Sequence, residues 1–283
     1  MLRSTTLTEF LNRPGAVVRL RISKVHGSSP REVGATMFVR EQGLYGTIGG
    51  GQMEYRAIET ARAMLLGNDV AHQIDMPLGP EIGQCCGGRI TIDMKRMNGK
   101  DKSAAFLAAQ DAENALPTVY IFGAGHVGRA LAELFQHLPV RAILIDQRSD
   151  ELQMSGATVE KRISAIPEAD IANASPGSAF VVLTHDHALD FLLAAAALDR
   201  GDACYVGMIG SATKRARFQN WARKHCEGLS AERLICPIGA SGSHDKRPAV
   251  IAAFVMAEVM TTLIRQKEAE HAQQQATPRR AAW

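Results

Sequence analysis

The sequence predicts an α/β protein in which a Rossmann-like, doubly wound parallel sheet follows a smaller α+β domain. The first observation is a GxGxxG motif, Gly123 to Gly128, that separates the β-branched and aromatic run 118–122 from a segment of helical spacing. The second is the regular alternation of strand-like and helix-like segments from residue 117 onward, which is typical of the doubly wound pattern. The third is that the first hundred residues lack this alternation, which predicts a separate domain in front of the Rossmann sheet.

The N-terminal domain is expected over residues 1–97. Its predicted strands are 16–26, 35–40, 44–48, 71–76 and 89–95. One helix is expected over 52–66, because Met53, Ala57 and Ile58 fall on roughly one helical face. A Gly-rich loop over 77–88 separates the last two strands. Short strands around one helix predict an α+β domain.

A linker that can include one short helix is expected over residues 98–116, because this segment is polar and Ala-rich and is stopped by Pro117. The Rossmann-like domain then occupies 117–246. Its predicted elements are strands at 118–122, 141–145, 179–183 and 203–206, helices at 127–137, 188–198 and 212–224, and a shorter element at 157–163. A C-terminal helix is expected over 247–272, since Pro248 suits a first helical turn. The last residues, 273–283, are expected to be a disordered tail.

The composition argues against a protein that binds nucleic acid or spans a membrane. The 283 residues are 46% hydrophobic and 22% charged, with a formal net charge of +3. Neither this charge nor any sustained basic face points to nucleic acid. The longest apolar runs are shorter than the ~20 residues that span a bilayer, and the N-terminal residues lack the apolar core of a signal peptide. Five cysteines without a secretion signal suggest a reducing compartment, so we expect a cytoplasmic protein that binds neither nucleic acid nor membrane.

The GxGxxG motif indicates a ligand-binding turn. Gly123 permits a tight turn, Gly125 lets the backbone approach a ligand, and Gly128 lets the helix pack closely on the strand. The helix N-terminus offers free N–H groups to an anion. Asp146 ends the next strand, where it would accept from the ribose of NAD or from a donor-rich edge such as that of a pterin. Arg148 is either a further anion contact or a surface charge.

Two further segments follow strands whose carboxyl ends should lie at the same edge of the sheet. His185 and His187 are either site residues, conceivably a metal pair, or solvated side chains at a helix start. A second glycine turn contains Gly207, Gly210 and Ser211 and leads into a basic helix. It predicts either a second anion-binding turn or a tight connection between strand and helix.

The N-terminal domain carries a different kind of candidate site. Cys85 and Cys86 lie in the Gly-rich loop, where a thiolate could be a nucleophile, a persulfide carrier or a soft metal ligand. The alternative is that they are small buried side chains. Three consecutive glycines, 49–51, are costly in chain entropy unless the backbone must bend or approach something closely. Together with the loop 27–31, these segments suggest one shared glycine-lined surface.

In these motifs the chain resembles the XdhC/CoxI family, most closely its branch of xanthine dehydrogenase accessory proteins, over nearly its whole length. The motifs that carry the resemblance are Gly27–Arg31, Gly34-Ala35, Gly49-Gly50-Gly51 with Glu54, Cys86-Gly87-Gly88, Phe122–Gly128 with His126, Asp146 with Arg148, Thr184–His187 with Asp190, Tyr205–Ser211, Cys236–Gly239 and Asp245–Pro248. Cys85 departs from this pattern, because only the second cysteine matches it.

The resemblance implies a molybdenum-cofactor chaperone. Such a protein would bind the molybdopterin cofactor, protect it while a cysteine desulfurase supplies its terminal sulfur, and insert it into the molybdenum subunit of apo-xanthine dehydrogenase. On this reading the glycine turn holds the phosphate of the cofactor, Asp146 its pterin edge, and Cys86 the molybdenum or its sulfur. A homodimer is expected from the frequency of such assemblies. The alternative reading is an NAD-dependent oxidoreductase, with His185 or His187 transferring the proton.

Overall fold

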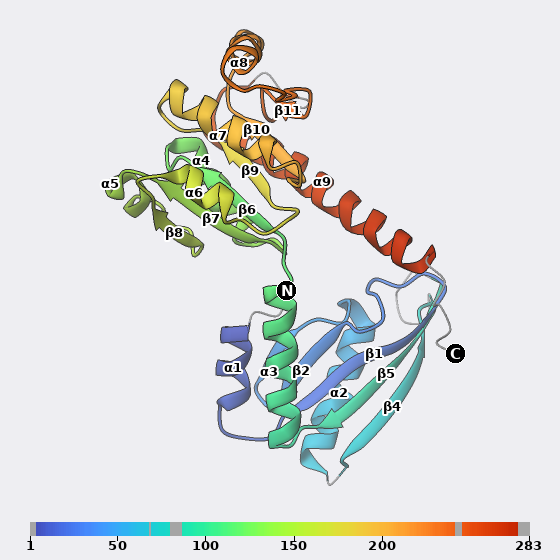
Figure 1. Cartoon of the computed structure of the whole chain (residues 1–283). Helices are drawn as coiled ribbons and strands as arrows, with labels where there is room; N and C mark the ends of the chain where they lie inside the picture. The colour runs from blue at the N-terminus through green and yellow to red at the C-terminus, as the bar shows by residue number, and fades with distance from the viewer. Residues whose placement is uncertain (1–3, 68, 80–86, 241–244, 277–283) are drawn as a thin grey trace, which may run out of the picture. The chain divides into compact units, whose positions relative to one another are not determined.

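The structure, a computed structural model, describes residues 4–67, 69–79, 87–240 and 245–276 (Figure 1). The chain divides into two compact units, residues 1–115 and 116–283. Each unit has its own hydrophobic core, and each is considered by itself below.

Unit 1 is built on an antiparallel sheet with the strand order β3-β2-β1-β5-β4. Its strands are β1 (Val18–His26), β2 (Thr36–Arg40), β3 (Gly43–Gly46), β4 (Ala71–Pro77) and β5 (Arg89–Arg96), and its helices are α1 (Ser4–Asn12), α2 (Gly51–Leu66) and α3 (Gly99–Asn114). Side chains alternate between the two faces of a strand. On β1, Leu20 and Ile22 are buried in the cluster beneath α2. Phe38 of β2 belongs instead to a second cluster, together with Leu7 of α1 and Ala109 of α3.

The segment expected to be a linker is a helix of unit 1, which corrects the prediction for residues 98–116. Helix α3 spans 16 residues and begins with a capping box in which Asn98 and Asp101 bond reciprocally to each other's backbone N–H. Ala109 is buried, and Lys102 Nζ donates to Leu11 O at 2.9 Å, which ties α3 to α1. The alanines that suggested a linker are strong helix formers, and tertiary packing fixes the helix in place.

Unit 2 confirms the Rossmann-like fold. Its parallel sheet has the strand order β11-β10-β9-β6-β7-β8, so the chain starts in the middle, builds one half of the sheet and then the other. The strands are β6 (Thr118–Phe122), β7 (Arg141–Asp146), β8 (Glu160–Ile163), β9 (Ala179–Val182), β10 (Tyr205–Met208) and β11 (Leu234–Ile235). The helices are α4 (His126–Phe135), α5 (Ser149–Gln153), α6 (Pro167–Ala172), α7 (His187–Asp199), α8 (Ala212–His225) and α9 (Pro248–Ala276). The order reverses between β6 and β9, where such folds bind ligands.

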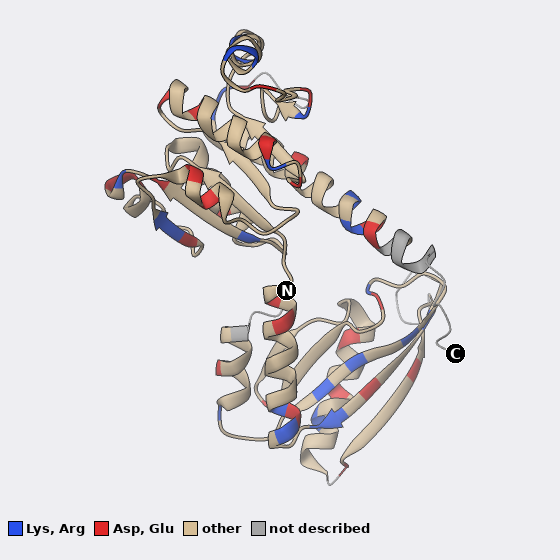
Figure 2. Ribbon diagram, viewed as in Figure 1, with Lys and Arg blue, Asp and Glu red and all other residues tan. Residues whose placement is uncertain are grey.

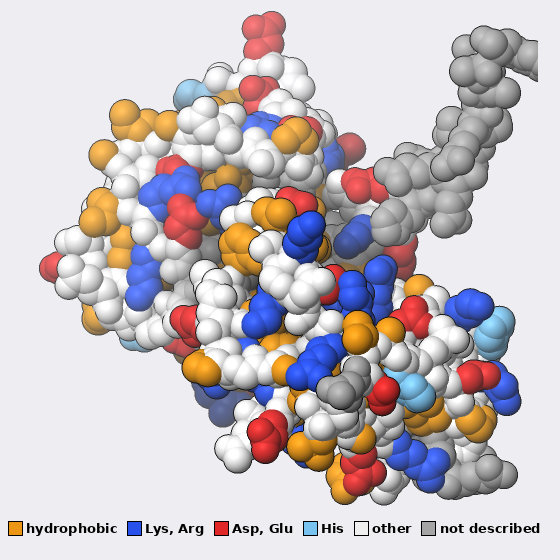
Figure 3. Space-filling model, turned by 90° about the horizontal axis from the view of Figure 1, so that it is seen from below, with side chains coloured by type: hydrophobic (Ala, Val, Ile, Leu, Met, Phe, Trp, Pro, Cys, Tyr) orange, Lys and Arg blue, Asp and Glu red, His pale blue; other side chains and the backbone are white. Residues whose placement is uncertain are grey.

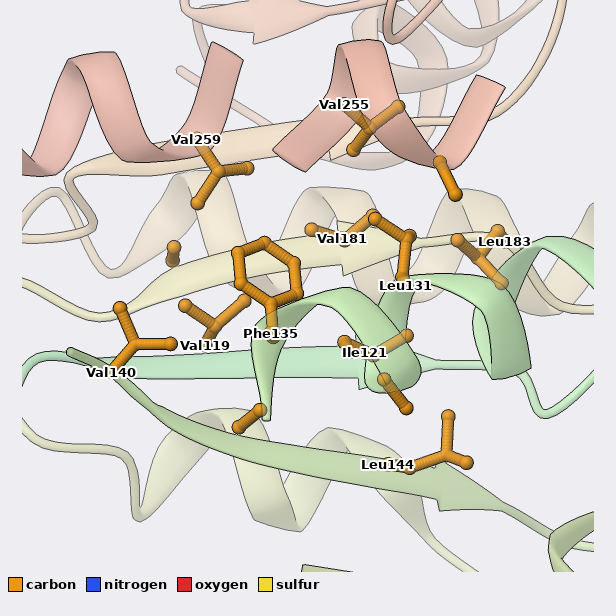
Figure 4. Packing of buried hydrophobic residues seen from close by; sticks show 14 of the residues in the cluster. Val119, Ile121, Leu131, Phe135, Val140, Leu144, Val181, Leu183, Val255 and Val259 are labelled. Atoms are coloured by element: carbon orange, nitrogen blue, oxygen red, sulfur yellow. The ribbon is translucent and has the colours of Figure 1, made fainter. Parts of the chain in front are cut away.

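Both faces of this sheet are covered. Figure 4 shows the face on which Leu131 and Phe135 of α4 and Val255 and Val259 of α9 pack over the strands. On the other face Phe180 of β9 packs against residues of α7 and α8. Because the strands are buried on both faces, they read as continuous apolar runs in the sequence.

Helix α9 is longer than predicted, since it continues to Ala276, and the predicted tail lies outside the described residues from 277 onward. By length and composition its segment Pro248–Glu270 would suffice to cross a membrane, which corrects the expectation from apolar run lengths. Ala252, Val255 and Val259 are fully buried in the core of unit 2, although only 22% of the apolar window is buried. A single helix of this kind is weak evidence for a membrane span.

Charge is spread over both units. On the face drawn in Figure 3, Lys and Arg side chains are interspersed with Asp and Glu and with uncharged surface. That face offers no continuous basic surface of the kind that phosphate backbones require.

We predict that Asn98→Ala destabilises unit 1 by about 1 kcal/mol, because it removes the cap of α3. A linker would tolerate the change without loss. Urea unfolding followed by circular dichroism measures the difference, with Lys100→Ala, one residue into the same helix, as the matched control. Equal stability of wild type and Asn98→Ala would contradict an integral α3.

Candidate functional site

The glycine turn between β6 and α4 is fixed by backbone contacts. Gly123 has φ +116°, and a Cβ there would lie 2.3 Å from Leu183 O. A Cβ on Gly128 would lie 1.8 Å from Gly123 O. Gly125 differs, because a Cβ at this position would meet nothing within 4 Å. Two glycines are therefore required by packing, and the third leaves open space beside the helix N-terminus.

The N-terminus of α4 has no side-chain cap, unlike the other two long helices that start at this edge of the sheet. Asp186 caps α7 by accepting from Ala188 N, and Ser211 caps α8 by accepting from Lys214 N. The N-cap of α4 is Gly125, which has no side chain to accept these bonds. The first N–H groups of a helix lack partners within the helix and attract anions. Among α4, α7 and α8, only α4 therefore has an N-terminus that no side chain caps.

The carboxylate of Asp146 already accepts hydrogen bonds from other groups of the protein. Its Oδ2 accepts from Ala124 N at 2.7 Å, and its Oδ1 accepts from Arg148 N at 2.9 Å. The Arg148 guanidinium adds bonds from Nε to Oδ1 (3.0 Å) and from Nη2 to Oδ2 (3.1 Å). Burial by itself would raise the pKa of Asp146, but these hydrogen bonds outweigh it and hold the pKa below its usual value. The four acceptor positions of the carboxylate are thus taken.

The arginines around the turn are paired as well. Arg129 Nη1 donates to Ala124 O at 2.7 Å and to Glu151 Oε2 at 2.5 Å, and Arg148 Nη1 lies 3.6 Å from Glu151 Oε1. Two arginines and two carboxylates therefore form a neutral network around Ala124. Sequence reasoning missed Arg129 and Glu151, although their positions in the first turns after β6 and β7 place both at the sheet edge.

A small pocket with a free volume of about 10 Å³ lies at the point where the strand order reverses. It is lined by Phe122, Gly123, Ile145, Asp146, Gln147, Pro167, Thr184, His185, Leu189 and Leu193. Its walls are mostly apolar and come from the ends of β6, β7 and β9 and from α6 and α7. This space holds about one water molecule, so a ring could enter next to the glycine turn only if the walls moved apart.

The loop after β9 is organised by Asp190, which is fully buried. Asp190 Oδ1 accepts from Thr184 N (2.9 Å) and Thr184 Oγ1 (2.7 Å), and Oδ2 forms an ion pair with Lys214 Nζ. Lys214 was not predicted as a partner, because it lies 24 residues away on α8. His185 and His187 are exposed. Over the described residues no group of three His, Cys, Asp or Glu side chains could hold a metal ion.

The second glycine turn is shaped by packing. Gly207 lies inside β10, where a Cβ would meet the Tyr205 ring at 2.5 Å and Ile238 at 2.6 Å. At Gly210 a Cβ would meet the Lys214 side chain at 2.7 Å. Because Ser211 caps α8, the predicted residues Gly207, Gly210 and Ser211 have structural roles in this fold. The structure places them at the same sheet edge as the first turn, but with their groups already engaged.

In unit 1 the predicted glycine-lined surface exists. A Cβ on Gly49 would lie 2.8 Å from the Pro30 ring, and a Cβ on Gly88 would lie 2.1 Å from Ser28 O. Ser28 also forms an isolated bridge with Gly87. The loops 27–31 and 49–51 and the glycines that follow Cys86 therefore lie together. Cys85 and Cys86 themselves lie outside the described residues.

Glu54 holds the triple-glycine loop in place. Gly49, Gly50 and Gly51 all have positive φ, between +64° and +135°. Glu54 Oε2 accepts from Thr47 Oγ1 (2.5 Å), Ile48 N (2.9 Å) and Gly50 N (3.2 Å). Burial raises the pKa of Glu54, but these bonds more than compensate and lower it. Glu54 therefore stabilises the loop, while a Cβ on Gly50 would still meet open space.

A parallel sheet of this order, with an uncapped glycine turn at its reversal point, defines a Rossmann-type ligand-binding domain. Sequence comparison agrees: the XdhC Rossmann domain matches residues 119–259, and the description "XdhC and CoxI family" applies to residues 11–74. The chain belongs to the XdhC/CoxI family.

Structural comparison also finds a similar protein. A crystal structure from Bacillus halodurans, described as a xanthine dehydrogenase at 2.80 Å resolution, matches with a TM-score of 0.79 and 16% identity. The match covers 94% of this chain and 96% of the other. At this identity the likeness shows the fold alone. Comparison with curated protein sequences gives no match.

We predict that Asp146→Asn destabilises unit 2 by about 2–4 kcal/mol at pH 7, because Arg148 loses its buried partner. A carboxyl whose pKa is lower when folded contributes its stability above the unfolded value of ~3.9 and loses it as pH falls further. The gap between wild type and variant should therefore persist at pH 5 and narrow below about pH 4. Urea unfolding at several pH values checks this, and a gap that stays constant down to pH 3 would contradict the assigned pKa direction.

Proposed function

We propose that this protein is an accessory protein of xanthine dehydrogenase that binds the molybdenum cofactor, protects it during sulfuration and inserts it into the apoenzyme. Its partners would be the molybdenum subunit of xanthine dehydrogenase and a cysteine desulfurase. The protein would act in the cytoplasm, as a homodimer. Family membership supports the general accessory role.

One observation carries the cofactor assignment: the uncapped N-terminus of α4 beside the open space at Gly125. Molybdopterin has a terminal phosphate and a flat, fused ring. The phosphate would lie at the glycine turn, where N–H groups and the helix dipole attract it. The ring would then enter the neighbouring apolar pocket, bordered by Phe122 and Ile145. The glycine turn therefore suits the phosphate, whereas ring binding would require this pocket, with about 10 Å³ of free space, to widen.

The proposed role of Cys86 is contact with the molybdenum or its terminal sulfur. Supporting it is the position of the two glycines that follow, which lie with the loops 27–31 and 49–51 on one surface of unit 1. A Cβ on Gly50 or Gly87 would meet open space, so a ligand could approach the backbone there. Cys85 takes a secondary role.

The NAD-dependent alternative loses its main support. The residue that would accept from the ribose is Asp146, and its acceptor positions are filled by Ala124 N and the Arg148 side chain and backbone. Ribose binding would have to break this buried arrangement. The geometry therefore favours a ligand held by its phosphate and ring, without a bond to Asp146.

We predict that Gly125→Asp lowers cofactor binding at least about tenfold without unfolding the protein. The new carboxylate would enter open space at the start of α4 and repel the phosphate. The Gly125→Ala variant adds only a Cβ, which meets nothing within 4 Å and cannot cap the helix, and is the control that should stay near wild type. Molybdenum content and pterin fluorescence are measured after purification from cells that make the cofactor. Cofactor content of Gly125→Asp equal to that of Gly125→Ala would place the phosphate elsewhere.

We predict that Cys86→Ala retains the pterin but reduces the sulfurated fraction of the cofactor several-fold, because the thiol contacts the metal end and not the phosphate. Activation of apo-xanthine dehydrogenase by the loaded protein, divided by the molybdenum transferred, reports that fraction. Cys85→Ala is the control and should stay near wild type. Wild-type protein that carries neither molybdenum nor pterin would overturn the proposed function itself, and tight NADH binding with hydride transfer would favour the oxidoreductase.

A further inference from the structure

Unit 1 contains an open groove on the sheet face that carries α3, which reaches the glycine-lined surface only at Arg31. Its volume is about 620 Å³. The residues that the argument uses are Arg19, Arg21, Arg31, Ala104, Ala108 and Ala112. The buried ring of Phe38 contributes to its floor. No step of the proposed cofactor chemistry uses this groove.

The groove is basic, because Arg19, Arg21 and Arg31 line it and no acidic residue does. Among the described residues none of the three forms an ion pair within 4 Å. Two carboxylates lie near them: Asp93 is opposite Arg21 on β5 and accepts from Gln73 at 2.6 Å, and the pKa of Asp101 is lowered by its bond to Lys95 and also by the charge of Arg19. The three arginines and Lys95 outnumber these two carboxylates, so the groove keeps an excess of positive charge.

The other wall is the uncharged middle of α3, which Figure 2 shows in tan between the charged residues near its ends. Ala104, Ala108 and Ala112 recur every four residues and are exposed, so they form one stripe along the helix. Neighbouring Leu107 is 55% exposed. Small side chains let a second helix approach closely, and the exposed leucine adds apolar contact.

The spacing of the arginines fits a helix. Arg19 and Arg21 lie two residues apart on β1 and so share a face at a separation of about 6.6 Å. Acidic residues at positions i and i+4 of an α-helix rise by about 6 Å. We propose that this groove docks an acidic helix of a partner protein, with its carboxylates on Arg19 and Arg21 and its backbone against the alanine stripe of α3.

The identity of the partner rests on the proposed function: the helix would belong to the molybdenum subunit of xanthine dehydrogenase. The test measures binding of that purified apo-subunit to the full chain by calorimetry at several salt concentrations. Reversing two charges, in the Arg19→Glu/Arg21→Glu double variant, should weaken binding at least about tenfold at low salt. Arg56→Glu/Arg62→Glu, on the exposed face of α2, is the matched control and should stay within about twofold.

A steric variant tests the alanine stripe. Ala108→Trp should block the helix and weaken binding at least about tenfold, while Gln110→Trp, on another face of α3, should not. Cofactor content, measured in parallel, should be unchanged in all four variants. If the wild-type chain carries no cofactor but the variants still differ in binding as expected, the proposed function is overturned and the groove assignment stands.

A second probe keeps the groove testable if the apo-subunit does not bind. This probe is a 21-residue alanine-rich peptide with Glu at successive i and i+4 positions, and its control carries Gln instead. Helical binding that is lost in Arg19→Glu/Arg21→Glu supports the groove as an acidic-helix site. Absence of peptide binding, equal binding of the Gln peptide, or dimerisation of the chain through this groove in sedimentation would overturn the inference.

Discussion

The candidate site of unit 2 depends on a backbone contact that leaves no room for a side chain. Gly123 lies against Leu183 O, and Gly128 lies against Gly123 O, so the turn after β6 is held between the end of β9 and the first turn of α4. This contact points the start of α4 at the place where the strand order reverses. Asp146 also holds the turn in place, because its carboxylate accepts a hydrogen bond from Ala124 N. The uncapped N-terminus of α4 is therefore held rigidly, because strand, turn and helix all pack against one another at this point.

The sequence predicted the position of this turn but not the partners that Asp146 finds within the protein. A glycine motif after a strand is local, so spacing suffices to find it. The partner of a carboxylate depends instead on rotamers and on where neighbouring donors point. Arg148 was predicted either to contact an anion or to be a surface charge, and it folds back onto Asp146 instead. Lys214 was missed as the partner of Asp190 for the same reason, since 24 residues and a strand separate them.

The fold was likewise predicted where the sequence signal is local, and it was not predicted where stability depends on contacts between distant residues. The strands of unit 2 were predicted close to their observed bounds, because burial on both faces makes them continuous apolar runs. The length of helix α3 and its place in unit 1 were not predicted, because Ala-rich and polar segments carry little amphipathic signal and its stability comes from Asn98 and from packing of Ala109. Short elements that are not continuous apolar runs show no usable pattern either, as with α5, whose five residues are mostly polar, and β11, which has two residues.

The distribution of charge suits a protein that must release its ligand. At the glycine turn Arg129 and Arg148 are neutralised by Glu151 and Asp146, so a phosphate there is held mainly by backbone N–H groups and the helix dipole. Such contacts select an anion through geometry, without the strong ion pairs that would slow its departure. Arg19, Arg21 and Arg31 lie instead in the groove of unit 1, where charge can steer a partner protein. The proposed carrier would then recognise its acceptor through this charge while it holds the cofactor without strong ion pairs.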